Sequence, residues 1–496
     1  MPFLNRTLRV AALASLPVVC AYADVTLPAL LSDHMVVQRG LPVHIWGKAA
    51  PAEAVSVAFR GVTRAATADE IGHWSIYLPP SDAGGPFELG VKGNNTVTLS
   101  DVMVGEVWVD SGQSNMEFAL RTAMNAADEI AAADHPGIRQ FRVNLLASPF
   151  PQTEAIGQAW SVCTPQSAGR FSAVAYFFAR ELEAKLGVAV GLIDSYWGGT
   201  PVEAWTRAAA LGEDAAVAPL FASWGSMTER QADAELRAKN RQRMIDDAKA
   251  QGKPAPVFPW TPQLDSWGPG MLYNGMIAPL TPLPIRGAIW YQGESNSLLE
   301  RAPLYSRIFR DMIEDWRRQW GVGDFPFLFV QISNFKSTPA EDWATLREQQ
   351  LKTLALRNTA MAVTIDIGNP DNVHPTDKVD VGLRLARAAR VLSYGEAIED
   401  SGPIYRQATP EGSSIRAWFD HAKGLMAKGG ELTGFEVAGV DGKFVAATAT
   451  IDGETVLVAS PSVAEPMFVR YGWANNPQCN LFNGEGLPAS PFRSVE

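Results

Sequence analysis

Strands and helices alternate from about residue 104 to about residue 395, and this alternation restricts the fold more than any other feature of the sequence. An N-cap candidate, Ser172, opens a helix whose apolar stripe ends at Leu186, just before Gly187. A buried strand over 188–193 follows directly. Further strands are expected at 287–291, 325–332 and 359–367, with helices near 303–320, 341–356 and 376–391. Such a pattern predicts an α/β fold, with a parallel sheet covered by helices on both faces.

The regions on either side have a different pattern. From Asp24 to about Ser100, and again after about Ser401, short apolar runs are separated by Pro and Gly turns, which is typical of β-rich domains. The 496 residues also exceed what one hydrophobic core usually supports. We therefore predict four segments: a signal peptide at 1–23, a β-sandwich-like domain at 24–103, a catalytic α/β domain at 104–400, and a β-rich domain at 401–496. A charged helical excursion interrupts the α/β region at about 211–263.

The first residues predict export. Arg6 and Arg9 precede an apolar stretch that ends in Ala21-Tyr22-Ala23, the small-x-small pattern of a cleavage site. No later stretch is apolar and long enough to span a bilayer. We expect a periplasmic or secreted protein whose mature chain begins at Asp24.

Charge and cysteine content limit the kinds of ligand that the chain is expected to bind. The chain has 42 Lys and Arg against 53 Asp and Glu, a formal charge of -11, which disfavours nucleic acid and anionic membranes as partners. Two cysteines remain after signal cleavage, Cys163 and Cys479, and their spacing matches no metal motif. They could form one disulfide or remain as two buried thiols. We expect no metal and no cofactor, and the oligomeric state stays open.

Ser114 is the candidate nucleophile. It lies in Gly112-Gln-Ser-Asn-Met116, a few positions after the predicted buried strand that ends at Val109. Ligands of open α/β sheets bind at the carboxyl ends of the strands, where a serine can be exposed beside backbone amides. The segment lacks the second glycine of a Gly-x-Ser-x-Gly elbow. A serine in this position could also be only a helix cap.

His374 is the candidate base among six histidines. Roles in packing, turns or the surface are sufficient for the other five. His374 lies in a predicted loop between a strand and a helix that Thr376 can cap. Asp371 could orient and stabilise the imidazole, and Asp366 is the alternative acid. Both aspartates could instead serve only to order the loop.

Two further strand ends carry polar groups. Gly198 and Gly199 offer backbone amides that can approach an oxyanion, and Gln292 offers a side-chain amide for the same purpose. Tyr196, Trp197 and Tyr291 could stack on a sugar ring, or could belong to the core. The remaining predicted substrate contacts are Gln113, Asn115 and Glu294.

Six segments together resemble the sialate O-acetylesterase-like carbohydrate esterases of the SGNH hydrolase superfamily. They are "LLSDHMVVQRGLPVHIWG", "GEVWVDSGQSNME", "SYWGGTPVEAW", "WYQGESN", "DNVHPTDK" and "NLFNGEGLPASPFR". The resemblance implies an SGNH-type three-layer α/β/α sheet, with Ser114 as nucleophile and His374 as base. It also implies oxyanion donors at Ser114, at Gly198 or Gly199, and at Gln292. The Gly-x-Asn-Asp motif of the superfamily is not matched; Gln292 takes its place, with Asn296 as the weaker alternative.

The resulting hypothesis is a serine-dependent acetylesterase acting on an acetylated carbohydrate, either sialic acid or a plant hemicellulose such as xylan or xyloglucan. One alternative is a glycoside hydrolase that uses Glu294 with Glu106 or Asp110 as its second carboxylate. The other is a non-catalytic carbohydrate-binding protein, which the flanking β-domains would suit.

Overall fold

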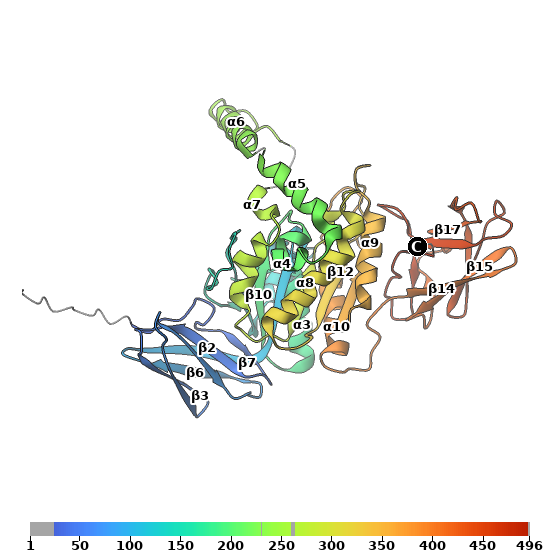
Figure 1. Ribbon diagram of the computed structural model, residues 1–496. Helices are drawn as coiled ribbons and strands as arrows, with labels where there is room; N and C mark the ends of the chain where they lie inside the picture. Colours follow the sequence, from blue (N-terminus) through green and yellow to red (C-terminus); the bar gives the residue numbers. More distant parts are fainter. Residues whose placement is uncertain (1–23, 230, 259–262, 495–496) are drawn as a thin grey trace, which may run out of the picture.

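The computed structural model describes residues 24–229, 231–258 and 263–494. Figure 1 shows a β-rich part at one end, a central part of strands and helices, and a second β-rich part at the other end. The predicted signal peptide, 1–23, lies outside the described residues. The thiols of Cys163 and Cys479 are both free, so they form no disulfide. No helix among the described residues is long and apolar enough to cross a membrane.

A mostly parallel sheet forms the centre of the molecule. Its strand order is β13-β12-β11-β7-β10-β8-β9, and every neighbouring pair is parallel except β8 and β9. The strands are β7 (Thr96–Gly112), β8 (His135–Arg142), β9 (Ser161–Cys163), β10 (Val190–Tyr196), β11 (Gly287–Tyr291), β12 (Phe327–Gln331) and β13 (Thr359–Val363). All residues of β10, β11 and β12 are buried, as expected for strands covered on both faces.

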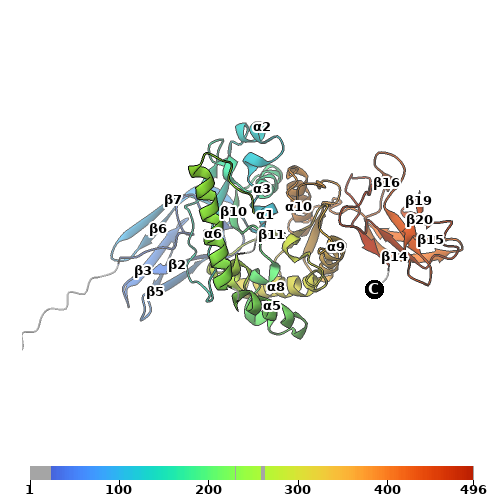
Figure 2. The same ribbon diagram turned by 90° about the horizontal axis from the view of Figure 1, so that it is seen from above.

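Helices cover both faces of this sheet, which confirms the predicted α/β class. In the view along the strands, α3 (Ala173–Leu186) and α10 (Val379–Leu392) lie on one side, and α8 (Tyr305–Trp320) and α9 (Trp343–Lys352) on the other (Figure 2). The short helices are α1 (Ser114–Glu117), α2 (Ala126–Ala131), α4 (Ala208–Leu211) and α7 (Leu264–Trp267).

The ends of two helices test the predicted caps. Ser172 accepts a hydrogen bond from the Ala175 amide at 3.2 Å, and Gly187 closes α3 in the left-handed conformation at φ 65°. The prediction for Thr376 was wrong. Helix α10 begins three residues later, at Val379, and Lys378 occupies its N-cap position without a side-chain cap.

The N-terminal β region is continuous with the central sheet. Strand β7 pairs with β6 and β1 along its first half and with β10 and β11 along its second half, so the predicted boundary at 103/104 falls inside one strand. One hydrophobic cluster runs from Val25 to Ala389. The strands are β1 (Val36–Gln38), β2 (Val43–Lys48), β3 (Ala54–Phe59), β4 (Val62–Thr67), β5 (His73–Leu78) and β6 (Gly84–Lys92).

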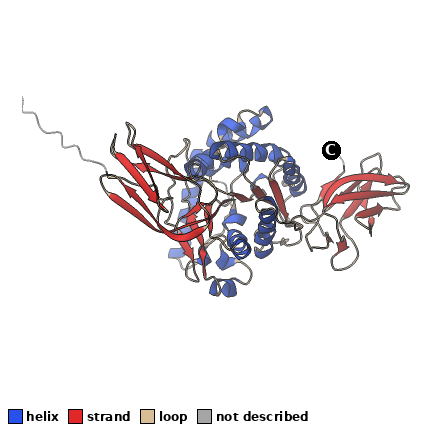
Figure 3. Cartoon of the chain, turned by 90° about the horizontal axis from the view of Figure 1, so that it is seen from below, coloured by secondary structure: helices blue, strands red, loops and turns tan. Residues whose placement is uncertain are grey.

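The C-terminal region has its own core, built from two four-stranded sheets and a two-stranded one (Figure 3). Its strands are β14 (Ile404–Glu411), β15 (Ser414–Asp420), β16 (Met426–Ala427), β17 (Phe435–Ala438), β18 (Val445–Ala446), β19 (Thr448–Asp452), β20 (Thr455–Ala459), β21 (Phe468–Tyr471), β22 (Leu481–Phe482) and β23 (Phe492–Arg493).

Two helices, α5 (Ala218–Glu229) and α6 (Gln231–Ala250), form the excursion between β10 and β11. They extend away from the central part in Figure 1. Residues 235–240 of α6 are exposed, in agreement with their charged sequence.

Candidate active site

Ser114 and His374 meet at the carboxyl edge of the central sheet. Strand β7 ends at Gly112, whose φ of 134° and lack of a Cβ let the chain pass beside β11; an added Cβ would lie 2.2 Å from the Tyr291 carbonyl oxygen. The chain then turns, and Ser114 opens α1. His374 Nε2 lies 2.8 Å from Ser114 Oγ, although the two residues are 260 positions apart. Both side chains are partly exposed, so a substrate can reach them.

Burial and one charged neighbour influence the protonation of His374. Burial and the nearby Lys378 ammonium both lower its pKa, so the imidazole is neutral at neutral pH. Its Nδ1 has no hydrogen-bond partner within the described ranges. Asp371 is exposed, and its carboxylate makes no hydrogen bond to the ring. Asp366 instead binds Arg384 through both oxygens, at 2.7 and 2.8 Å.

The side-chain amides of Gln113 and Asn115, on either side of the nucleophile, are buried and hydrogen-bond to neighbouring loops. Gln113 Oε1 accepts hydrogen bonds from the loop after β11, including the Ser295 amide at 3.2 Å. Asn115 Nδ2 donates to Glu294 at 2.5 Å and to the Val373 carbonyl at 3.0 Å. These two side chains are 3% and 1% exposed. They tie the serine turn to both neighbouring loops, so their predicted contact with substrate does not occur in this arrangement.

A buried lysine completes this cluster. Lys378 Nζ donates to Asn115 Oδ1 at 2.6 Å and lies about 5 Å from the ring centroids of Phe118 and Tyr291. Burial lowers its pKa to about 7, and the Glu294 carboxylate opposes that shift. Burial also raises the pKa of Glu294, whose Oε2 has no partner among the described residues. The Asn115 amide, next to the nucleophile in sequence, therefore links two ionisable groups, the Lys378 ammonium and the Glu294 carboxyl.

The candidate oxyanion donors differ in availability. The backbone N–H groups of Ser114 and Gly199 have no acceptor among the residues described. The Gly198 N–H donates to Glu117 Oε2 at 2.8 Å, on a carboxylate that is 34% exposed. Gln292 is fully buried, and its amide nitrogen faces three acceptors within 3.2 Å, on Gln113, Thr200 and Asn296. Here Gln292 holds loops together and does not offer its N–H to the site.

The three aromatic candidates differ in their exposure to solvent. Trp197 is partly exposed beside the serine turn, where its amide donates to the Gly112 carbonyl at 3.1 Å. Tyr196 and Tyr291 are 2% and 0% exposed and belong to the core. Only Trp197 of these three can meet a sugar ring.

The carboxylate pair of a glycosidase is not formed. Glu106 is fully buried and paired with Arg39 and Arg286. Asp110 is fully buried beside Asp194, and burial raises the pKa of both. Neither side chain faces open space across from Glu294, as two carboxylates flanking a scissile bond must.

Sequence reasoning missed two polar residues of the site, Glu117 and Lys378. Both lay in quoted motifs, three or four positions after Ser114 and His374. No signal in the sequence marked either residue: the N-cap position of Lys378 follows from the start of α10 at Val379, which the sequence did not predict.

Comparisons with known proteins relate the whole chain to carbohydrate esterases. A family model described as a carbohydrate esterase, sialic acid-specific acetylesterase, matches residues 260–391. The sialate O-acetylesterases of Mus musculus and Homo sapiens are each 29% identical, covering 93% of this chain and 93% and 91% of theirs. The crystal structure of a carbohydrate acetylesterase from Xanthomonas citri is 41% identical, with a TM-score of 0.83 over 95% of this chain and 99% of that one.

Proposed function

The chain belongs to the sialate O-acetylesterase-like family of carbohydrate esterases, and we propose that it removes acetyl groups from a carbohydrate by a serine mechanism. The observation that carries the proposal is the 2.8 Å separation of Ser114 Oγ and His374 Nε2. This separation is hydrogen-bond distance for a nucleophile and its general base.

In this mechanism, His374 takes the Ser114 proton while Oγ attacks the acetyl carbonyl carbon. The tetrahedral intermediate collapses, the bond to the sugar oxygen breaks, and His374 returns the proton to the departing hydroxyl. Water then attacks the acetyl-enzyme with the same assistance and releases acetate. The Ser114 and Gly199 N–H groups are the proposed oxyanion donors; Gly198 joins them once the carbonyl oxygen displaces the Glu117 carboxylate.

We propose a neutral acetylated hemicellulose, such as xylan or xyloglucan, in preference to sialic acid. The formal charge of -11 opposes an anionic sugar. A sialic acid carboxylate would need a free cation near the serine turn. The Arg142 guanidinium lies 3.6 Å from the Glu117 carboxylate and is already paired with it. Export to the periplasm or the medium, which would give access to such polymers, is part of the same proposal.

Acetate release from a panel of acetylated glycans tests this proposal. We expect turnover of acetylated xylan and xyloglucan oligosaccharides at a higher kcat/KM than 9-O-acetylated sialic acid. A preference for sialic acid would contradict the substrate assignment, and release of no acetate from any of them would contradict the function.

The identity of the triad acid gives a separate prediction. If Asp371 moves onto His374 Nδ1 when substrate binds, Asp371→Asn should lower kcat by about 10² to 10⁴-fold, because the tautomer is no longer fixed. Asp366→Asn breaks the double contact with Arg384 and should mainly lower thermal stability. Steady-state kinetics and melting curves of both variants check this. The opposite ranking in kcat would assign the acid to Asp366.

The pH profile tests the influence of Lys378 on the base. His374 must be neutral to act, so kcat/KM should fall on the acid side with an apparent pKa below the ordinary histidine value. Lys378 is cationic in that range, because its own pKa is about 7. Lys378→Gln removes the charge and keeps an N–H donor for Asn115, so the acid limb should move to higher pH. An acid limb that stays in place would show that Lys378 does not tune His374.

A further inference from the structure

Strands β2 and β5 form a two-stranded ribbon in the N-terminal β region. They pair antiparallel with each other and with no other named strand of the described chain. Val43, Ile45 and Ile76 point into the core. Successive side chains of a strand point to opposite faces, so the other face carries three cross-strand pairs: His44 with Tyr77, Trp46 with Ser75, and Lys48 with His73.

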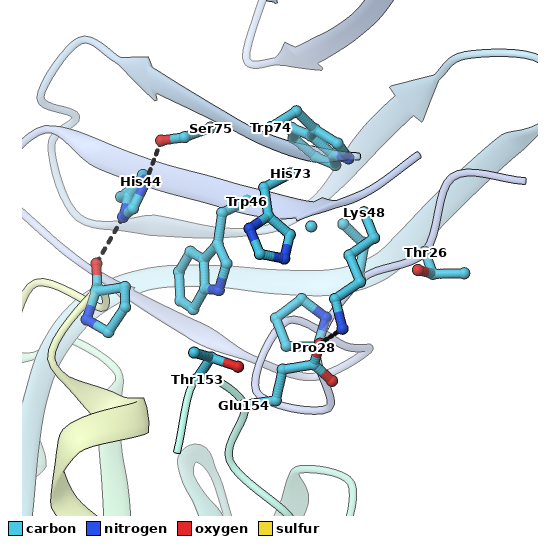
Figure 4. Close-up of a pocket in the computed structure, with 13 residues that line it drawn as sticks. Thr26, Pro28, His44, Trp46, Lys48, His73, Trp74, Ser75, Thr153 and Glu154 are labelled. Carbon is cyan, nitrogen blue, oxygen red and sulfur yellow. Dashed lines mark hydrogen bonds and ion pairs between the residues drawn. The ribbon is translucent and has the colours of Figure 1, made fainter. Parts of the chain in front are cut away.

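A cavity of about 290 Å³ lies between this ribbon and a loop of the α/β part. Figure 4 shows the Trp46 indole on its wall between His44 and His73, with Lys48 beyond His73 and with Thr153 and Glu154 below. The volume is close to the lower limit for small-molecule sites.

The aromatic wall of the cavity is held in place. His44 Nδ1 lies 2.8 Å from the Pro282 carbonyl oxygen, which can only accept, so Nδ1 carries the proton. Nε2 then accepts from the Ser75 hydroxyl at 2.7 Å. Burial lowers the pKa of His44 and keeps the ring neutral. The His44 ring stacks on Tyr77 and on Trp46, with ring centroids 4.1 and 4.9 Å apart. This stacking fixes the indole before a ligand binds.

The polar groups of the cavity suit a neutral ligand. Lys48 is paired with Glu154, so the two charges offset each other and leave no net charge at this edge of the cavity.

We propose that this cavity is a second saccharide-binding site, in which a neutral sugar unit stacks on Trp46 and its hydroxyls meet the surrounding polar groups. Sugars present an apolar face to aromatic rings and hydroxyls at their edges. The choice of a sugar as ligand rests on the proposed function; the cavity contains neither Ser114 nor His374. The site would hold the polymer while acetyl groups are removed elsewhere on the enzyme.

Titration calorimetry with xylohexaose and cellohexaose, both neutral and free of acetyl groups, tests the proposal on the full chain. Trp46→Ala should weaken binding of the better ligand by at least about fivefold. Trp46→Phe, which keeps a ring, should weaken it less. Phe150→Ala removes an exposed aromatic side chain outside the cavity and should leave binding unchanged.

Hydrolysis of p-nitrophenyl acetate by the same variants separates the two sites, because this small ester needs only the serine. Its kcat/KM should be the same for Trp46→Ala and for the parent enzyme. The proposal is overturned if neither hexasaccharide binds, if Trp46→Ala binds as tightly as the parent, or if anionic sialyllactose binds as well as the neutral sugars. Trp46-dependent binding without acetate release from any glycan would contradict the proposed function but support this second binding site.

Discussion

Replacing Ser114 with alanine is expected to lower kcat/KM for acetate release by at least about 10⁴-fold. The substitution removes one oxygen atom, whose hydrogen bond to His374 is the only one that it makes among the described residues. The turn is held by the buried amides of Gln113 and Asn115, so the variant should fold normally. Coupled-assay kinetics and a melting curve check the two halves of this prediction.

Ser295→Ala is the matched control for this experiment. Ser295 lies in the adjacent loop, and its hydroxyl makes no hydrogen bond among the described residues. Its loss should change the rate little. If Ser114→Ala kept the activity of the Ser295→Ala enzyme, Ser114 would not be the nucleophile and the serine mechanism would be contradicted.

Replacing Arg347 with methionine is expected to lower the free energy of unfolding by about 3–5 kcal/mol. Its guanidinium is fully buried and donates to the carbonyls of Ile332 and Ser333 at 3.0 and 3.1 Å, and of Ala474 and Asn475 at 2.8 and 2.7 Å. Burial lowers its pKa to about 10, so it remains charged at neutral pH. Methionine would leave four carbonyls without this donor where the C-terminal region meets the central part.

Urea denaturation of the variant measures this loss, with Arg357→Met as the control. Arg357 pairs with Asp324 at 2.6 Å, but its side chain is 80% exposed. Surface pairs of this kind contribute less than about 1 kcal/mol. Equal losses in the two variants would show that Arg347 does not join the two regions.

Much of the architecture was predictable because the hydrophobic period changes at the right places. Helix α3 was predicted from Ser172 to Gly187, and both caps are present. The continuity of β7 through two sheets was not predictable, since the inward and outward alternation of a strand does not reveal which partners it has. Thr376 failed as a cap because the loop after His374 runs further than a cap preference can indicate.

Prediction of the site was more uneven. Ser114 follows a predicted strand end, and His374 was the remaining candidate among six histidines. The sequence therefore allowed this nucleophile and base to be predicted as a pair. Spacing in a loop has no period, however, and cannot tell whether an amide faces solvent or a neighbouring loop. Gln113, Asn115 and Gln292 were therefore predicted as substrate or oxyanion contacts, whereas the structure uses them to connect three loops.

The most direct test of the central claim is covalent labelling with a fluorophosphonate, which reacts with activated serine hydroxyls, followed by mass spectrometry of the digested protein. Our account predicts one adduct, on the peptide that contains Ser114, formed much more slowly in His374→Gln. An adduct on another residue, or equal labelling of Ser114 with and without the imidazole, would contradict it.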